Sequence, residues 1–106
     1  MNTTPLNVEA AEITGAPSLD AIDVYWQNRG PGQGSVTLCC FGSAWTAYFG
    51  AMNERSIQKF FMDADTGYLV NKLGITSQLK QAKRNLLYLA RIINAVKESL
   101  KQERTA

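Results

Sequence analysis

The chain of 106 residues has the length of one ordinary domain, and its 45% hydrophobic and 19% charged residues are typical of a globular protein and exclude a disordered one. We therefore expect a single domain over residues 1–106. No apolar run is long enough to span a bilayer, and no basic stretch followed by an apolar one marks a secretory signal. We expect a cytoplasmic protein that makes no contact with membranes.

The charges are divided unevenly between the two halves of the chain. Residues 1–53 contain four acids and one base, net −3, whereas residues 54–106 contain ten bases and five acids, net +5. The overall net charge of +2 is too small to indicate nucleic-acid binding by itself. The asymmetry favours either nucleic acid or an acidic protein as a partner.

Residues 1–17 form the least patterned part of the chain. Proline and glycine interrupt this segment, and the alternation of apolar and polar side chains between them is weak. Both an edge strand and a flexible arm remain open for it.

Three segments have the alternating pattern of antiparallel strands. Apolar and polar side chains alternate in residues 19–28, 35–41 and 44–49, which are separated by the glycine-rich residues 30–34 and by the pair Gly42-Ser43. These connections are too short for a parallel crossover, and the glycines precede a strand where a phosphate-binding loop would precede a helix. The side chains expected to face the core are Ile22, Val24, Trp26, Val36, Leu38, Cys40, Trp45, Ala47 and Phe49.

Residues 54–74 are expected to form two short helices. Asn53 is a candidate N-cap for the first helix, which shows apolar residues at helical spacing. The second helix is expected over residues 68–73, ending at Gly74, because glycine is favoured just after the last helical residue.

Residues 77–102 have the strongest helical pattern, with Thr76 or Ser77 as the cap. Apolar side chains recur three and four positions apart along the segment. This stripe is expected to cover the sheet as a second layer, while a coiled-coil seam that joins two copies is the other explanation. A monomer and a homodimer through this helix therefore both remain open. The stripe consists of Leu79, Ala82, Leu86, Leu89, Ile93, Val96 and Leu100, widened by Leu87, Ala90 and Ile92.

The chemistry needed for catalysis or metal binding is poorly represented. Cys39 and Cys40 are adjacent, and on a strand their side chains point to opposite faces, so a disulfide between them would be strained. The chain has no histidine, which removes a common metal ligand and the usual base of a serine or cysteine nucleophile. We expect free thiols, no metal, no cofactor and no enzymatic activity.

A basic face is expected on the C-terminal helix. Lys80, Lys83, Arg84 and Arg91 lie away from the apolar stripe, where they could neutralise nucleic-acid phosphates. The same pattern is typical of an ordinary solvated helix face or of a surface for an acidic protein.

An aromatic surface is expected on the sheet. Tyr25 and Tyr48 fall on the faces of their strands opposite to Trp26 and Trp45, which we expect in the core. If helices cover only one face of the sheet, the two tyrosines are exposed together beside Arg29. Aromatic side chains next to arginine are typical of the residues that dominate protein–protein binding.

Four runs of sequence carry a resemblance. They are VYWQ at residues 24–27, GPGQG at residues 30–34, AWTAYFGAM at residues 44–52 and YLVNKL at residues 68–73. Together, over about residues 20–75, the chain resembles small accessory proteins of bacteriophages and prophages of enteric bacteria. The resemblance transfers no functional residue. It implies that the protein acts in the cytoplasm of the host bacterium, because small phage proteins of this kind often bind one host protein or complex, including nucleic-acid-handling machines of host defence.

The sequence thus predicts an α+β fold in which an antiparallel meander of three or four strands, within residues 19–49, packs against the long C-terminal helix. The expected function is that of a phage-encoded, non-catalytic protein that inhibits a host protein complex, such as an anti-CRISPR or other anti-defence inhibitor, through Tyr25, Arg29 and Tyr48. The alternative is a small DNA- or RNA-binding regulator that uses the basic helix face.

Overall fold

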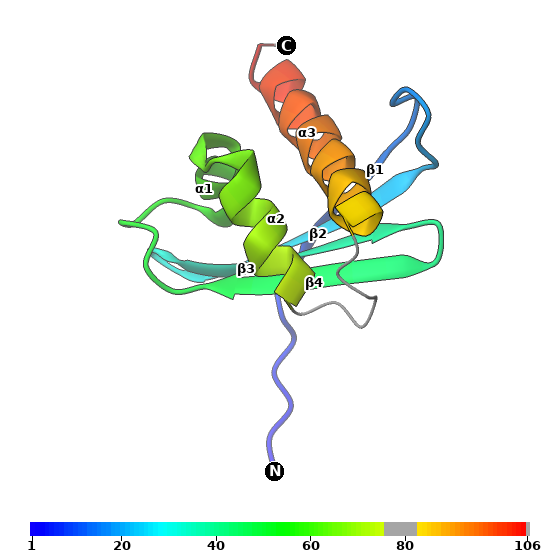
Figure 1. Cartoon of the computed structure of the whole chain (residues 1–106). Helices are drawn as coiled ribbons and strands as arrows, with labels where there is room; N and C mark the ends of the chain where they lie inside the picture. Colours follow the sequence, from blue (N-terminus) through cyan, green and yellow to red (C-terminus); the bar gives the residue numbers. More distant parts are fainter. Residues whose placement is uncertain (76–82, 106) are drawn as a thin grey trace.

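Four strands are followed by three helices in the computed structural model, which describes residues 1–75 and 83–105 (Figure 1). The described chain therefore has the α+β architecture expected from the sequence. No described helix combines the length and apolar character needed to cross a bilayer. The elements are β1 (Glu9–Ile13), β2 (Ile22–Gly30), β3 (Gln33–Cys40), β4 (Ser43–Phe49), α1 (Ile57–Asp63), α2 (Thr66–Ile75) and α3 (Lys83–Thr105).

The sheet is an antiparallel meander in the order β1-β2-β3-β4, so each strand pairs with its neighbour in the sequence. This confirms the predicted meander. The N-terminal segment, for which a strand and an arm were both open, supplies the edge strand β1, with Glu9 opposite Trp26 and Ile13 opposite Ile22. Residues 1–8 precede this strand without forming a helix or strand.

The turn between β3 and β4 lies one residue earlier than expected. Cys40 pairs with Ser43, so the two turn residues are Phe41 and Gly42 and the expectation of a Gly42-Ser43 turn is wrong. Both turn residues have positive φ, 50° and 77°, as a tight hairpin requires to follow the twist of its strands. Phe41 is consequently 81% exposed at the hairpin tip.

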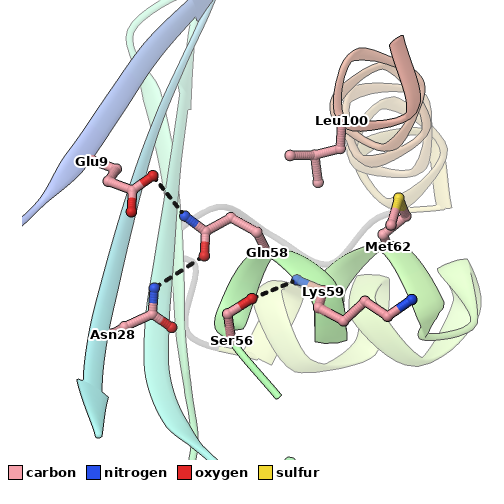
Figure 2. Close-up of a pocket in the computed structure, with 7 residues that line it drawn as sticks. All are labelled: Glu9, Asn28, Ser56, Gln58, Lys59, Met62 and Leu100. Carbon is pink, nitrogen blue, oxygen red and sulfur yellow. Dashed lines mark hydrogen bonds between the residues drawn. The ribbon is translucent and has the colours of Figure 1, made fainter. Parts of the chain in front are cut away.

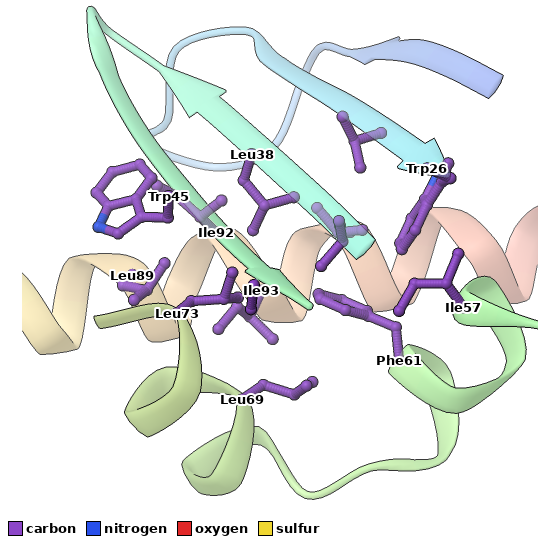
Figure 3. Close-up of a cluster of buried hydrophobic side chains, with 14 of the residues drawn as sticks. Trp26, Leu38, Trp45, Ile57, Phe61, Leu69, Leu73, Leu89, Ile92 and Ile93 are labelled. Atoms are coloured by element: carbon purple, nitrogen blue, oxygen red, sulfur yellow. The ribbon is translucent and has the colours of Figure 1, made fainter. Parts of the chain in front are cut away.

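The three helices lie on one face of the sheet, and the core fills the space between the two layers (Figures 1 and 3). All the strand side chains expected to face the core are buried. Trp26 meets Phe61 of α1 edge to face at 5.2 Å between ring centroids. Leu69 and Leu73 of α2 and Ile92 of α3 are fully buried in the same cluster. Each such side chain contributes about 1.5–3 kcal/mol to folding.

The apolar stripe of α3 packs against the sheet within the same chain. Leu89, Ile93 and Val96 are buried in the core, as the two-layer prediction requires. Leu87 does not widen the stripe, since it is 57% exposed. It precedes Leu89 by two positions, about 200° around the helix, and so lies nearly opposite it. Leu79 and Ala82 lie outside the described residues.

The first helix is capped by Ser56, where the sequence suggested Asn53. The Ser56 hydroxyl accepts a hydrogen bond from the backbone amide of Lys59 at 3.2 Å, and α1 begins at the next residue. Asn53 and Glu54 instead adopt positive φ values of 53° and 65°. Their loop crosses the β2–β3 turn so closely that a Cβ on Gly32 would lie 3.1 Å from the Glu54 nitrogen.

The second helix is longer than expected at both ends. Asp65 caps its start by accepting a hydrogen bond from the Tyr68 amide at 3.3 Å. Gly74 does not end it but lies buried inside it, which corrects the prediction. A Cβ on Gly74 would come 3.2 Å from a methyl carbon of Leu86, so this glycine permits the close approach of α2 and α3. The predicted N-cap of the third helix, Thr76 or Ser77, lies outside the described residues.

Candidate functional site

The face of the sheet opposite the helices is covered by no helix that the structure describes (Figure 1). We call it the open face. Its centre carries small side chains, and the hydroxyls of Thr37 and Thr46 lie 3.0 Å apart across β3 and β4. The open face consists of Ala10, Glu12, Asp23, Tyr25, Gln27, Ser35, Thr37, Cys39, Ala44, Thr46 and Tyr48.

Tyr25 and Tyr48 flank this centre of small side chains. Their side chains are 39% and 57% exposed, and both belong to the open face. Tyr25 pairs with Thr37 of β3. Tyr48 pairs with Ser35, which lies two positions before Thr37 on β3. From strand spacing and rise, their Cα atoms are about 12 Å apart. The two tyrosines therefore share one surface without touching each other.

Arg29 lies at the margin of the open face. It is exposed at the irregularity that shifts the β2–β3 register between Asn28 and Gly30. Its Nη2 donates to Oε1 of Gln27 at 3.5 Å, and the hydroxyl of Ser35 donates to the same oxygen at 3.4 Å. The open face thus carries one guanidinium beside Gln27, on the same strand as Tyr25.

The predicted basic face is only partly described. Lys80 lies outside the described residues, and so do the side chains of Lys83 and Arg84, whose backbones form the first turn of α3. Arg91 is directed at the β1–β2 connection, where its Nη2 donates to the carbonyl oxygens of Pro17 and Ser18, both at 3.4 Å. This arginine therefore helps to hold a loop to α3.

Lys97 has a structural role that the sequence did not indicate. Its ammonium donates to the carbonyl oxygen of Ala64 and to the hydroxyl of Thr66, the latter at 3.2 Å. Burial lowers the pKa of Lys97, with the nearby Asp65 carboxylate opposing the shift. Because Ala64 is the C-cap of α1, the lysine joins α3 to the junction between the other two helices.

A cleft of about 510 Å³ opens between the β1–β2 edge and α1 (Figure 2). Its polar groups already bond to one another: Gln58 donates to Glu9 at 3.1 Å, and Asn28 donates to Gln58 at 3.0 Å. The opposite wall is apolar, with Met62 and Leu100. Since these amides and the carboxylate are committed to linking strands and helix, the cleft is more simply explained as part of the scaffold than as a ligand site.

The two cysteines occupy different environments. Cys39 is half-buried on the open face, Cys40 is buried in the core, and both are free thiols. The Cys40 sulfur lies 3.2 Å from the hydroxyl of Tyr88 on α3. This hydrogen bond, together with burial, raises the pKa of Tyr88 to about 12. Within residues 1–75 and 83–105, no three cysteine or acidic side chains gather in a group that could hold a metal ion.

A protein-family model matches most of the chain. The family, Phage_phiTE_072, is described as a phage family, and its model matches residues 1–86. The chain belongs to this phage family. No curated protein and no solved structure matches the chain. The relation to phage accessory proteins expected from the sequence is thereby confirmed.

The open face of this phage-family protein lies within the matched residues. Tyr25, Arg29 and Tyr48 all belong to that region. Sequence reasoning missed a second group of aromatic residues, because Phe60 and Tyr68 lie on two separate helices and approach Tyr48 only in the folded chain. The excess of aromatic residues between positions 45 and 68 is the one signal in the sequence that could have pointed to it.

Proposed function

We propose that this phage-family protein is a non-catalytic binding protein that inhibits a host protein complex, as an anti-CRISPR or other anti-defence inhibitor would. The observation that carries the proposal is the open face, on which Tyr25 and Tyr48 are exposed on either side of a centre of small side chains. The core and the described helices lie on the other side of the sheet, so this face makes no contribution to the core that partner binding would disturb.

The composition of the open face suits a protein partner. Tyrosine and arginine are enriched among residues that dominate binding energy, and small side chains between them allow a partner backbone to come close. The hydrogen-bonded sheet fixes the positions of the two tyrosines before binding. Little backbone freedom is therefore lost on association, which favours a tight stoichiometric complex.

The proposed inhibition requires occupancy and no chemical step. A partner surface covered by the open face would be unable to reach its own substrate or subunit. Amounts of inhibitor and target would then have to match, and activity of the target would return when the inhibitor dissociates.

A capture experiment tests the proposal. Tagged protein would be used to capture partners from a lysate of an enteric bacterium, with and without nuclease, beside the double variant Tyr25→Ser with Tyr48→Ser. We expect one host complex that survives nuclease and is captured at least about 30-fold less by the double variant, since two anchor residues together contribute about 2 kcal/mol or more. Leu87→Ser, which changes an exposed apolar residue of α3, is the matched control and should capture normally.

Two results would contradict the proposal. Loss of all protein partners after nuclease treatment would mean that nucleic acid mediates capture. Equal capture by the double variant and the Leu87→Ser control would remove the open face from the interaction.

A second candidate function is nucleic-acid binding, which the net charge of +5 over residues 54–106 favours. The binding of fluorescent DNA or RNA would then fall steeply as salt increases. The double variant Lys83→Glu with Arg84→Glu should bind the nucleic acid more weakly than the wild type at the same salt concentration. Tyr25→Ser should leave it unchanged, which separates the two functions.

A further inference from the structure

A small aromatic pocket opens where β4 ends against α1 and α2. Its volume is about 200 Å³, below the roughly 300–1,000 Å³ typical of small-molecule sites, so it suits a single side chain better than a cofactor. We call it the aromatic pocket. Its lining residues are Tyr48, Phe49, Gly50, Ala51, Phe60, Tyr68 and Lys72.

Three rings from three elements form its wall. Phe49 lies 5.0 Å from Phe60 and 6.3 Å from Tyr68, measured between ring centroids, and Phe60 lies 6.3 Å from Tyr68. Phe49 is buried, whereas 43% of Tyr68 is exposed. The three rings therefore support one another through mutual contacts, while part of the aromatic surface faces solvent, as in a preformed anchor site.

Tyr48 is held at the edge of this pocket by the backbone of Gly50. A Cβ built on Gly50 would lie 3.2 Å from a ring carbon of Tyr48 and 3.3 Å from its hydroxyl oxygen. The tyrosine ring thus lies across the glycine, at the end of the open face. One side chain consequently belongs to both surfaces.

Among the residues that line the pocket, Lys72 is the one with a charged side chain. The Arg55 guanidinium lies 5.0 Å from the Phe60 ring centroid, but it also pairs with Asp63 at 3.6 Å. The Lys72 ammonium lies 5.7 Å from the Tyr68 ring centroid. No described carboxylate lies within ion-pair distance of Lys72. Lys72 can therefore pair with an anion that a ligand brings.

We propose that the aromatic pocket anchors an acidic segment of a partner protein. It would receive one aromatic or long aliphatic side chain, and a neighbouring carboxylate of the segment would pair with Lys72. This inference rests on the proposed function and names part of the contact: Tyr48 would join the pocket to the open face, so the partner would reach around the end of β4.

A protein segment fits the charges better than a nucleic-acid strand does. A base could stack on the same rings, but a strand binds through a row of cations that follows its phosphates. Arg55 is already paired with Asp63, which leaves Lys72 as the described cation of the pocket that has no described acidic partner. One cation beside one ring-lined pocket matches a carboxylate next to an apolar side chain.

The test uses small probes on the isolated protein. Isotope-labelled protein would be titrated with indole-3-propionate, which joins an aromatic ring to a carboxylate, and with tryptamine, which joins the same ring to an ammonium. We expect the carboxylate probe to shift the amide signals of Gly50, Ala51 and Tyr68 in the nuclear magnetic resonance spectrum. Tryptamine should bind at least about threefold more weakly, as one exposed ion pair allows.

Variants separate the rings from the charge. Tyr68→Ala should weaken the carboxylate probe about tenfold, because a wall of the pocket is lost. Lys72→Glu should reverse the preference, so that tryptamine binds more tightly than indole-3-propionate. Lys101→Glu makes the same change of charge on an exposed residue near the C-terminal end of α3, outside the pocket lining, and should leave both affinities unchanged. Retained dispersion of the spectra shows that each variant is folded.

Two outcomes would overturn the inference. One is that neither indole compound shifts the pocket signals. It also includes the case in which the two compounds bind with equal affinity both to the wild type and to Lys72→Glu. The other is that thymidine monophosphate binds the pocket more tightly than indole-3-propionate, which would assign it to nucleic acid. Because these titrations contain no host protein, their failure would leave the capture test of the open face unaffected.

Discussion

At the scale of single residues, the contact between Tyr88 and Cys40 links α3 to the sheet. The hydrogen bond to Cys40 and burial raise the pKa of Tyr88 to about 12 from 10.0. The unfolded chain therefore loses this phenolic proton at lower pH than the folded chain does. It follows that the stabilisation is complete below about pH 10 and is lost as the pH rises towards 12.

Tyr88→Phe should remove this alkaline dependence. We expect the free energy of unfolding of the wild type to fall more between pH 9 and pH 11 than that of the variant, as measured by urea unfolding followed through tryptophan fluorescence. Cys40→Ala should move the Tyr88 pKa back towards 10 in a spectrophotometric titration of the phenol. Equal declines for the wild type and Tyr88→Phe would contradict the assigned cause.

Gly34 is a residue whose missing side chain matters. A Cβ there would lie 2.8 Å from the carbonyl oxygen of Gln27 and 3.0 Å from the Cβ of Ile57, so β2 and α1 would both have to move. We expect Gly34→Ala to lower the free energy of unfolding by about 2 kcal/mol through overpacking. Ser35→Ala, on the opposite face of the same strand, is the control and should cost less than about 1 kcal/mol. A Gly34→Ala variant as stable as the wild type would contradict the close approach of β2 and α1 to Gly34.

At the scale of elements, Asn28 attaches the first helix to the sheet. Its Oδ1 accepts a hydrogen bond from the backbone N–H of Ile57 at 2.8 Å. Its Nδ2 donates to the side-chain oxygen of Gln58, as Figure 2 shows. Asn28→Ala leaves the part-buried Ile57 amide without this acceptor and should cost about 1–2 kcal/mol. Asn28→Asp keeps the acceptor and places a negative charge at a helix N-terminus, so its cost should be smaller. Equal losses in urea unfolding would show that the acceptor is unimportant.

The strands and the third helix could be predicted because their patterns are local. The alternation around Trp45 and the three-four spacing around Leu89 depend only on neighbours in the sequence, and both segments bury the expected side chains. The boundaries of the short helices depend on distant contacts. The conformation of Asn53 is set by the close approach of its loop to Gly32, and Gly74 lies inside its helix because Leu86 packs against it. Neither contact can be read from neighbouring residues in the sequence.

The candidate site likewise has some features that local sequence patterns predict and others that depend on distant contacts. Alternation was enough to place Tyr25 and Tyr48 on one face of the sheet. It could not show that Tyr68 and Lys72 gather beside Tyr48, because this depends on how α2 lies against β4. Nor could it separate Lys97 from solvated lysines, since its hydrogen-bond partners come from the junction of α1 and α2.

At the scale of the whole molecule, binding through the open face and binding through the basic face of α3 should respond differently to salt. A partner held by Tyr25 and Tyr48 relies mainly on apolar contact, and we expect its affinity to change less than about threefold between 50 and 200 mM salt, against about 10³-fold or more for a protein that contacts many phosphates. Lys83→Glu with Arg84→Glu should therefore leave host-protein capture unchanged. Loss of capture in that variant, or a steep dependence on salt, would transfer the interaction to α3.

The order of the elements along the chain has a consequence for synthesis on the ribosome. Within residues 1–75 and 83–105, all four strands precede all three helices, so the layer that includes Trp26 and Trp45 is made well before α3. At roughly 5–20 residues per second, the stretch from the end of β4 to the end of α3 takes roughly 3–11 s to translate. Hairpins form within microseconds. The nascent chain therefore presents an uncovered apolar layer for seconds, and in this interval aggregation and chaperone binding compete with folding.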